Sequence, residues 1–449
     1  MQLNPAPKVY GEGIHRVTTP EKTFRRIKPL MGALGITRLA DITGLDYCNI
    51  PTYSAVVPAS HDILSIYNGK GTTKIQAKVG AVMEAAERHA ASHLRRDFIY
   101  ATYQELSETQ TVLDPQAMRI ALHPYYDKDK VLAWMEGFDL LQQCTILVPA
   151  ELVGYNISGQ FGHVCYALSS TNGLASGNTL EEAICHALCE LIERDAWTIA
   201  ELLSHWLPLA RYQNQSQHLG QPTLQKHTKS ELWDDVERYP NIDIEQTTSP
   251  IRTLVQKFRR AGLKPLIKNI TSDLGIPTIL VTIAEQAGPA LPRAHFGLGT
   301  HPDVRVALIR ALTEVAQSRA VDIQGVREDI ALSGEQNSGV AHTKRVSTIN
   351  RRSWYHLPSP HVQAFVDIPT YPHGDVREDI YFMSSRLRDA GLEQIIVVDV
   401  TEPEIGIPVV RVLVPGLECW SVDRTQIGQR ALQQWQIACM KEDHIHQIS

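Results

Sequence analysis

Acidic side chains recur at one spacing in three separate stretches of the chain. In the first two stretches a glutamate is followed three residues later by another glutamate and then by arginine; in the third, an amide replaces the second carboxylate. The members are Glu84, Glu87 and Arg88; Glu190, Glu193 and Arg194; and Glu314, Gln317 and Arg319. Residues three apart share one face of an α-helix, and the neighbouring residues are mainly Ala, Val, Leu, Ile and Met. We therefore expect three packed helices that each present two oxygen-bearing side chains.

These oxygen donors suit a hard cation. Several carboxylates on buried helix faces repel one another, and they stay ionised only where positive charge lies among them. Oxygen ligands favour Mg²⁺, which usually keeps water and phosphate oxygens as further ligands. Arg88, Arg194 and Arg310 carry guanidinium groups that could neutralise phosphate. The pattern therefore favours a nucleoside triphosphate held by metal ions.

Helical periodicity places further groups on the same faces. Measured from Glu182 at about 100° per residue, His186 lies at about 40°, Glu190 at about 80° and Glu193 at about 20°. On the third predicted helix, Arg310, Glu314 and Gln317 lie within about 60° of one another around the helix axis. Each helix is also entered through a loop that contains glycine, at residues 68–71, 172–178 and 297–301. Such loops let backbone N–H groups approach an anion.

Each of these features also has an ordinary structural explanation. A single Glu-x-x-Glu-Arg segment is usually a solvated helix face with an i,i+4 ion pair. Glu182 can complete a Thr-x-x-Glu capping box with Thr179, and Arg310 with Glu314 can form a structural ion pair. The Cys-His-x-x-Cys run at 185–189 lacks a second Cys/His pair at ligand spacing, which disfavours zinc. None of the glycine loops matches a P-loop, kinase or Rossmann signature.

The elements that must position these helices contain an internal repeat. A helix end with an Ala-Leu-Gly or Ala-Gly-Leu step leads into Asp or Asn, a β-branched residue and Thr, then an Ile-Pro turn and an apolar run. The three strand–turn–strand segments are 41–57, 269–283 and 399–414. β-Branched residues on both sides of a Gly/Pro turn predict paired strands.

The repeat also predicts the fold class. Apolar periodicity indicates helices at 73–95, 179–203 and 304–321. Short turns between the strands favour antiparallel or mixed sheets over a doubly wound parallel sheet. We therefore expect an α+β fold of repeated β-hairpin and helix units in layered sheets. Two polar stretches, 206–250 and 334–352, are predicted to be insertions or loops; the second is either solvated without a role or a basic lid over an anionic ligand.

Composition excludes several protein classes. The 449 residues carry a net charge of −6, which gives no reason to expect a nucleic-acid binder. No stretch approaches the length and apolarity of a membrane span, and residues 1–11 lack the apolar core of a secretory signal. The seven cysteines are scattered and odd in number. We therefore expect a cytoplasmic protein with reduced thiols, with no membrane partner.

With these motifs in this order, the chain resembles the YcaO superfamily of ATP-dependent enzymes that activate peptide backbone amides. The resemblance covers roughly residues 15–420, and within the superfamily it is nearest to the branch found beside TfuA-type partner proteins. The matching segments are Gly80-x3-Glu84-x2-Glu87-Arg88, Asn172-Gly-Leu-Ala-Ser-Gly-Asn178 through Glu190-x2-Glu193-Arg194-Asp195, Arg310-Ala-Leu-Thr-Glu314-x2-Gln317-Ser-Arg319, and Asp399-Val-Thr, Gly406-Ile-Pro and Val414-Pro415-Gly416.

The resemblance implies a YcaO-type fold with ATP and Mg²⁺ between its sub-layers, a peptide substrate and a homodimer. It divides the chain into an N-terminal strand–helix unit at 1–64, an ATP-binding domain at 65–420 that carries the polar insertions, and a C-terminal helix and tail at 421–449. The implied metal ligands are Glu84, Glu87, Glu190 and Glu193. The implied nucleotide-binding residues are Glu182, Arg194, Arg310 and Glu314, with Arg194 and Arg310 catalytic, and with Gln317, Asn172, Lys70, Arg16 and Arg26 as further candidates. The family's N-terminal basic residue is Arg16, Arg25, Arg26 or Lys28.

Two departures from the family pattern bear on the reaction. The serine that usually opens the first motif is Gly80, and the chain lacks the Pro-x-Pro-x-Pro tail of azoline-forming members. The predicted activity is therefore O-phosphorylation of a peptide amide by ATP for thioamide formation, with a TfuA-like partner delivering sulfur. The alternatives are an azoline-forming cyclodehydratase, a non-catalytic YcaO-like scaffold, and an unrelated Mg²⁺-dependent hydrolase.

Overall fold

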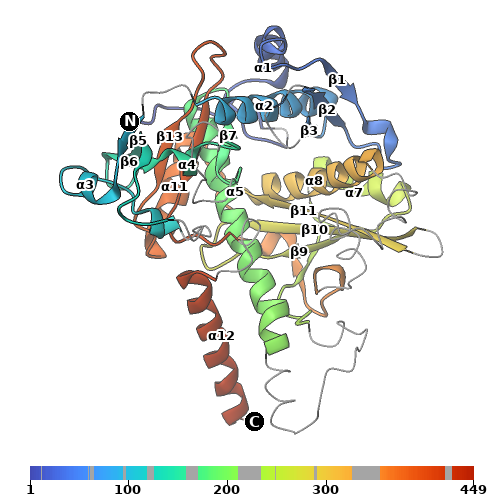
Figure 1. Ribbon diagram of the computed structural model, residues 1–449. Coiled ribbons are helices and arrows are strands. Elements are labelled where there is room, and N and C mark those ends of the chain that lie inside the picture. The colour runs from blue at the N-terminus through green and yellow to red at the C-terminus, as the bar shows by residue number, and fades with distance from the viewer. Residues whose placement is uncertain are drawn as a thin grey trace, which may run out of the picture.

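The computed structural model describes residues 1–449 except 12, 59, 61–64, 95–97, 119–125, 158–169, 211–233, 248, 288–290, 326–353, 420–426 and 449. It is an α+β protein in which three sheets surround three long helices (Figure 1). The predicted fold class is therefore confirmed. The helices are α1 Pro20–Ile27, α2 Lys74–Ser92, α3 Tyr103–Ser107, α4 Ala150–Val153, α5 Leu180–Glu201, α7 Ser249–Arg260, α8 Val304–Gly325, α11 Val376–Asp389 and α12 Gln429–Ile448.

The strands form sheets of three, five and six strands. The strand orders are β1-β2-β3, β11-β10-β9-β8-β12, and β4-β5-β13-β14-β7 with β6 paired to β5. Their bounds are β1 Arg38–Asp41, β2 Thr52–Val56, β3 Ile66–Lys70, β4 Ile99–Ala101, β5 Leu132–Asp139, β6 Cys144–Pro149, β7 Leu174–Ser176, β8 Asn241–Asp243, β9 Leu266–Asn269, β10 Thr278–Ala287, β11 Leu291–Thr300, β12 Val362–Ala364, β13 Ile396–Asp399 and β14 Val409–Leu413.

Three units of the same design make up the centre of the molecule. In the first, antiparallel strands β1, β2 and β3 lead into α2; in the second, β9, β10 and β11 lead into α8. The third unit joins its strands in a different chain order, because β13 and β14 pair with the earlier strand β7, which leads into α5. The predicted strand–turn–strand repeat is therefore confirmed, and each unit contributes one of the predicted acidic helices.

The turns of the three units share the same hydrogen bonds. In each, the threonine amide N–H donates to the side-chain oxygen two residues earlier, at 3.0, 3.1 and 2.9 Å: Thr43 to Asp41, Thr271 to Asn269 and Thr401 to Asp399. Each turn then needs one residue with positive φ, supplied by Asn49 (51°), Gly275 (67°) and Gly406 (65°). Asparagine adopts this conformation more readily than other side-chain-bearing residues, so the first copy can dispense with glycine.

Glycine brings the strands of two units into contact with their helices. A Cβ on Gly69 of β3 would lie 2.0 Å from the carbonyl oxygen of Ala77, and one on Gly299 of β11 would lie 2.0 Å from that of Ala307. Only glycine permits this approach. The close contact brings backbone N–H groups of the strand within reach of carboxylates on the helix.

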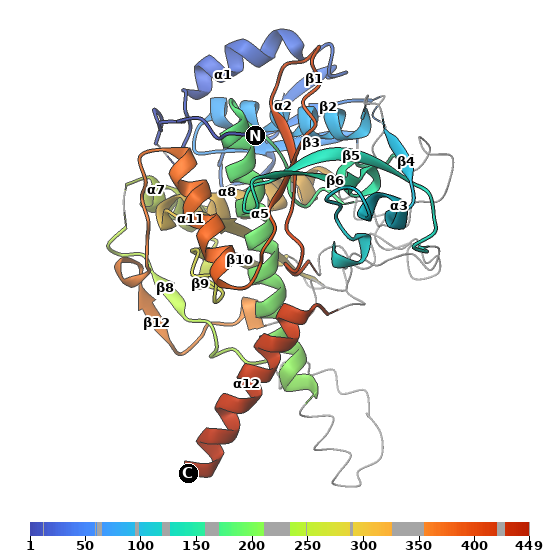
Figure 2. The same cartoon turned by 90° about the vertical axis from the view of Figure 1, so that its left-hand side faces the viewer.

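The C-terminal helix α12 extends away from the sheets beside the end of α5 (Figures 1 and 2), where its Ala438 packs against Leu203 and Leu207. Its first turn is also held by hydrogen bonds. Arg430 donates through Nε to both oxygens of Asp195 on α5, at 2.9 and 3.0 Å, and its other nitrogens bind Asp273. The buried carboxylate of Glu418 accepts two backbone N–H groups at the start of α12, both at 2.9 Å. We call Asp195, Arg430, Asp273 and Glu418 the anchor.

The polar stretch 206–250 is described in part. Residues 206–210 continue the helical path of α5, Asn241–Asp243 form β8, and α7 begins at Ser249. The other predicted insertion, 334–352, lies outside the described residues. None of the described helices has the length and apolar character that crossing a lipid bilayer requires.

Candidate active site

The three acidic helices converge on one cavity of about 380 Å³. Its walls come from α2, α5 and α8, from the end of β3, and from the N-terminal segment around Arg16. Of the residues predicted to bind metal or nucleotide, those that line the cavity are Glu84, Glu87, Glu190, Glu193, Glu182, Arg194, Arg310, Glu314, Gln317, Lys70 and Arg16. Asn172 and Arg26 do not line it.

The first helix holds its two glutamates by backbone and hydroxyl groups. Glu84 accepts the backbone N–H of Asn68 at 2.9 Å and lies 3.6 Å from Arg88. Glu87 accepts both the N–H and the hydroxyl of Ser176, at 2.9 and 2.7 Å. Burial raises the pKa of both carboxyls, that of Glu87 to about 7. These contacts fix the positions of the two carboxylates, and Arg88 partly compensates the charge of Glu84.

The second helix holds a carboxylate with an unsatisfied oxygen. Glu193 is 3 % exposed; Oε1 lies 3.7 Å from Arg194 Nη2, and Oε2 has no hydrogen-bond partner within the described parts of the chain. Burial raises its pKa to about 7, and Glu314 and Glu190 act in the same direction against Arg194. Burial also raises the pKa of Glu190. For both carboxyls the effect of burial on the pKa therefore outweighs that of the neighbouring arginines.

The third helix differs from the first two because its carboxylate is already paired. Lys70 Nζ donates to Glu314 Oε2, and the backbone N–H of Leu298 lies 3.4 Å from Oε1. Although burial acts in the opposite direction, Lys70 and Arg194 hold the pKa of Glu314 below its ordinary value. The neutral amide of Gln317 is the second oxygen-bearing side chain. This side of the cavity thus carries less uncompensated negative charge than the other two.

The three helices use equivalent positions. Asn68 precedes Glu84 by 16 residues, and Leu298 precedes Glu314 by 16 residues. Leu174 in β7 stands at the same separation from Glu190. Four residues before the three glutamates lie Gly80, His186 and Arg310, all lining the cavity. A Cβ on Gly80 would lie 3.2 Å from Gly69 Cα, so a larger side chain at this position would be tightly packed.

Glu182 joins the N-terminal segment to the cavity. Its buried carboxylate accepts the N–H of Val17 at 2.6 Å, and the N–H and side-chain amide of Asn178 at 2.8 and 2.9 Å. Arg16 Nε lies 3.9 Å away. Thr179 caps the helix by accepting the N–H of Glu182, but the carboxylate binds other partners than a capping box would give it. Glu182 therefore serves more than helix capping.

The two remaining candidates have other contacts. Arg26 is exposed and donates to the carbonyl and side-chain oxygens of Asn178, at 3.2 and 3.4 Å. Asn172 donates its amide to Cys419 Sγ at 3.1 Å. Of the four basic residues that competed for the N-terminal role, only Arg16 lines the cavity.

Sequence reasoning missed two groups that hold the site together. Ser176 binds Glu87 from the end of β7, and Asn178 binds Glu182 from the turn between β7 and α5; both lie in the predicted glycine loop 172–178. Their position in a glycine-containing loop was the available signal, but spacing along the chain does not indicate which loop residues turn toward a neighbouring helix.

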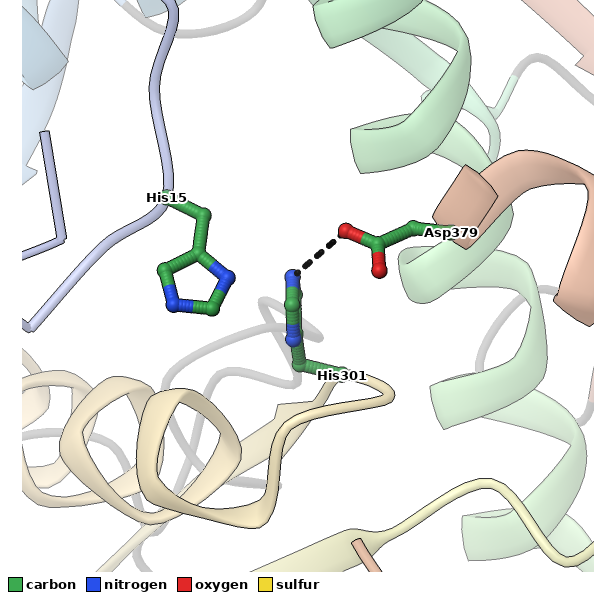
Figure 3. Close-up of side chains that lie close together, drawn as sticks. All are labelled: His15, His301 and Asp379. Atoms are coloured by element: carbon green, nitrogen blue, oxygen red, sulfur yellow. Dashed lines mark ion pairs between the residues drawn. The ribbon is translucent and has the colours of Figure 1, made fainter. Parts of the chain in front are cut away.

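A second cluster of titratable side chains lies beside the N-terminal segment (Figure 3). His301 Nε2 lies 3.7 Å from Asp379 and His15 Nε2 lies 3.6 Å from Asp303, while Lys8 lies 2.6 Å from Asp379. Because Nδ1 of His301 accepts the backbone N–H of Asp303 at 2.9 Å, a neutral ring carries its proton on Nε2. His301 then has no lone pair to offer a metal, and the cluster fixes the N-terminal segment in place.

A family model described as YcaO cyclodehydratase, ATP- and Mg²⁺-binding, matches residues 68–418. The chain belongs to the YcaO family. The match confirms the predicted family and the predicted ligands, ATP and Mg²⁺. Members of the family are ATP-dependent enzymes that modify peptides.

Two YcaO relatives align along nearly the whole chain. An uncharacterized protein of Methanothermobacter thermautotrophicus is 34 % identical over 92 % of this chain and 97 % of its own length. An uncharacterized protein in the tfuA 3′ region of Rhizobium leguminosarum bv. trifolii is 32 % identical over 93 % of this chain and 92 % of its own.

Two solved structures share the fold. A heterocyclase in complex with substrate and cofactor superposes with a TM-score of 0.72 at 23 % identity and covers 93 % of this chain, which spans 54 % of that protein. YcaO from Methanopyrus kandleri, bound with AMPPCP and Mg²⁺, superposes with a TM-score of 0.66 at 22 % identity, covering 94 % of this chain and 98 % of its own.

The cavity of this YcaO protein fits ATP and Mg²⁺ on its own chemistry. Glu193 Oε2 and Arg310 Nε are both buried and have no hydrogen-bond partner in the described part of the structure. A buried polar atom without a partner is costly, and a divalent cation at the carboxylate together with a phosphate at the guanidinium would satisfy both. The remaining carboxylates supply the oxygen ligands that Mg²⁺ prefers.

Proposed function

We propose that this protein uses MgATP to O-phosphorylate a peptide backbone amide, and that the activated amide then becomes a thioamide. The observation that carries the proposal is the gathering of Glu84, Glu87, Glu190 and Glu193 in one cavity with Arg194 and Arg310. ATP would supply the phosphoryl group that turns the amide oxygen into a leaving group, and Mg²⁺ would neutralise its phosphates.

The residues of the chain divide this work by charge. The four glutamates form a negative surface for the cations. Arg194 and Arg310 are placed to stabilise the charge that develops on phosphate oxygens during transfer. Lys70 is bound to Glu314, so it positions the third helix against the end of β3. Arg16 and Glu182 would hold the N-terminal segment over the nucleotide.

The proposal of thioamide formation, as opposed to azoline formation, depends on this chain belonging to the TfuA-associated branch of the family. The 32 % identical relative that lies in a tfuA 3′ region supports a TfuA-like partner for this chain. Azoline formation is the second candidate function, supported by the cyclodehydratase description of the family model and by the likeness to a heterocyclase. The homodimer stays a prediction, to be checked by light scattering.

One reaction distinguishes the products. The protein is incubated with a candidate precursor peptide, ATP, Mg²⁺ and sulfide, with and without a TfuA-like protein, and the peptide is analysed by mass spectrometry. Exchange of one oxygen for sulfur with release of phosphate is expected. Loss of one water would instead identify an azoline-forming enzyme, and ATP binding without any change in the peptide would contradict both.

A further inference from the structure

His186 on α5 contacts Arg310 on α8 across the cavity. Nη1 of Arg310 lies 3.0 Å from Nδ1 of His186, and both residues line the cavity. A guanidinium group has only donors, so Nδ1 of the imidazole must be the acceptor. The ring therefore presents its lone pair to Arg310, and a neutral ring carries its proton on Nε2.

The surroundings keep this imidazole neutral. Burial lowers the pKa of His186 well below its ordinary value, and the positive charges of Arg310, Arg16 and Lys70 act in the same direction. A neutral histidine keeps its acceptor at Nδ1. The contact with Arg310 is therefore between a fixed acceptor and a permanent cation.

The position of His186 follows from the three-unit design. Gly80, His186 and Arg310 occupy equivalent places on the three helices. At these places Gly80 has no side chain, His186 offers a hydrogen-bond acceptor, and Arg310 carries a positive charge. The glycine leaves space, and the acceptor faces the cation. In the described structure Arg310 has no hydrogen-bond partner at its buried Nε, while its Nη1 is held by His186.

We propose that His186 is a positioning residue for the ATP-dependent reaction, whose Nδ1 lone pair holds the guanidinium of Arg310 in the direction of the transferred phosphate. The inference rests on the proposed function for the role of Arg310, while the hydrogen bond itself belongs to the ligand-free protein. A positioned cation stabilises developing charge without reorganising during the reaction.

Two substitutions separate positioning from simple packing. In H186N the side-chain oxygen takes the place of Nδ1 and keeps an acceptor for Arg310. In H186L the volume is retained and the acceptor is lost. Because small misplacements of a catalytic group have large effects on rate, we expect H186L to lower kcat for ATP turnover by about tenfold to a hundredfold. H186N should recover most of this loss, and the exposed H361N should behave as wild type.

The coupling to Arg310 can be measured in a double-mutant cycle. If His186 acts through Arg310, the effect of H186L should largely disappear in an R310A background. A wild-type kcat in H186L, or an H186N variant no better than H186L, would overturn the proposal, because packing alone predicts that leucine is the better replacement.

A second measurement needs no reaction. In nitrogen-15 NMR of the ligand-free protein, one of the histidine rings with an unprotonated Nδ1 should lose its signal in H186N and shift in R310A. A protonated Nδ1 on His186 would overturn the proposal. If the wild-type protein failed to bind MgATP, the proposed function would fail, and the NMR result would still decide whether His186 accepts from Arg310.

Discussion

Helix α5 carries two buried acidic groups two residues apart, and they have opposite surroundings. Asp195 belongs to the anchor. Both of its oxygens accept from Arg430 Nε, and one also accepts the backbone N–H of Glu418. Glu193 faces the cavity, where one oxygen has no partner among the described residues. Burial raises the pKa of both carboxyls, to about 6 and about 7. The pKa values therefore do not distinguish a carboxylate whose oxygens all have partners from one with an unsatisfied oxygen, whereas the hydrogen-bond partners do.

The difference indicates what each charge contributes. A buried charge whose partners all come from the chain contributes to stability only while those partners remain. A buried charge left without partners is destabilising until a ligand binds it. This comparison can be tested by removing one charge from each region.

The largest effect is expected in the cavity. E193Q keeps the shape of the side chain and removes the charge that would bind Mg²⁺, so ATP turnover should fall by about a thousandfold, roughly 4 kcal/mol of transition-state stabilisation. The free energy of unfolding should stay unchanged or rise, because an unsatisfied buried charge is gone. Steady-state kinetics and urea unfolding measure the two quantities, with the exposed E136Q as the control. Turnover at the wild-type level would remove Glu193 from the site.

The next effect is expected in the anchor and should have the reverse pattern. R430M leaves Asp195 buried without its cation, so the free energy of unfolding should fall by about 3 kcal/mol. MgATP affinity should change little in the folded fraction, because Arg430 does not line the cavity. Urea unfolding and calorimetric titration provide the measurements, with R430K as the milder variant. A large loss of affinity with unchanged stability would show that the two regions are not separate.

The smallest effect is a change in Mg²⁺ affinity with pH. Burial raises the pKa of Glu87 from 4.5 to about 7, so below pH 7 a proton must leave before the metal binds. Affinity for Mg²⁺ should therefore fall as the pH falls from 8 to 6, by up to about tenfold per unit for each such proton. In the metal-free protein the same group favours the folded state more at pH 6 than at pH 8, because only the folded state holds that proton.

Calorimetric titration with Mg²⁺ and AMPPCP at pH 6 and pH 8 checks this dependence. In E87Q the remaining dependence should be shallower, since one of the two carboxyls with a pKa near 7 is removed. If Mg²⁺ affinity changed equally with pH in the wild type and in E87Q, then Glu87 would either titrate outside this pH range or not face the metal.

Local signals in the sequence were sufficient to predict the repeated units. The Asp/Asn-x-Thr turns and the Ile-Pro steps act within a few residues, and the structure has strands on both sides of each. The acidic helices were predictable for the same reason, because i and i+3 spacing is a property of one helix. Their convergence was a hypothesis that the sequence suggested only through repetition.

Contacts between distant segments were not predictable. Lys70 and Glu314 are 244 residues apart, and His186 and Arg310 are 124 apart. The sequence separation of neither pair indicates a contact, because the path of the chain between the units decides which side chains meet. The choice among Arg16, Arg25, Arg26 and Lys28 stayed open for the same reason. All four are basic residues near the start of the chain, and only the course of the N-terminal segment places Arg16 in the cavity wall.

The exchanged strand order of the third unit has a consequence during synthesis. The ribosome releases β7 and α5 well before β13 and β14, which complete their sheet. At about 5–20 residues per second, the apolar face of α5 remains without β13 and β14 for on the order of ten seconds or more after its own synthesis. The helix that carries Glu190 and Glu193 therefore acquires the two strands that complete its sheet late in synthesis.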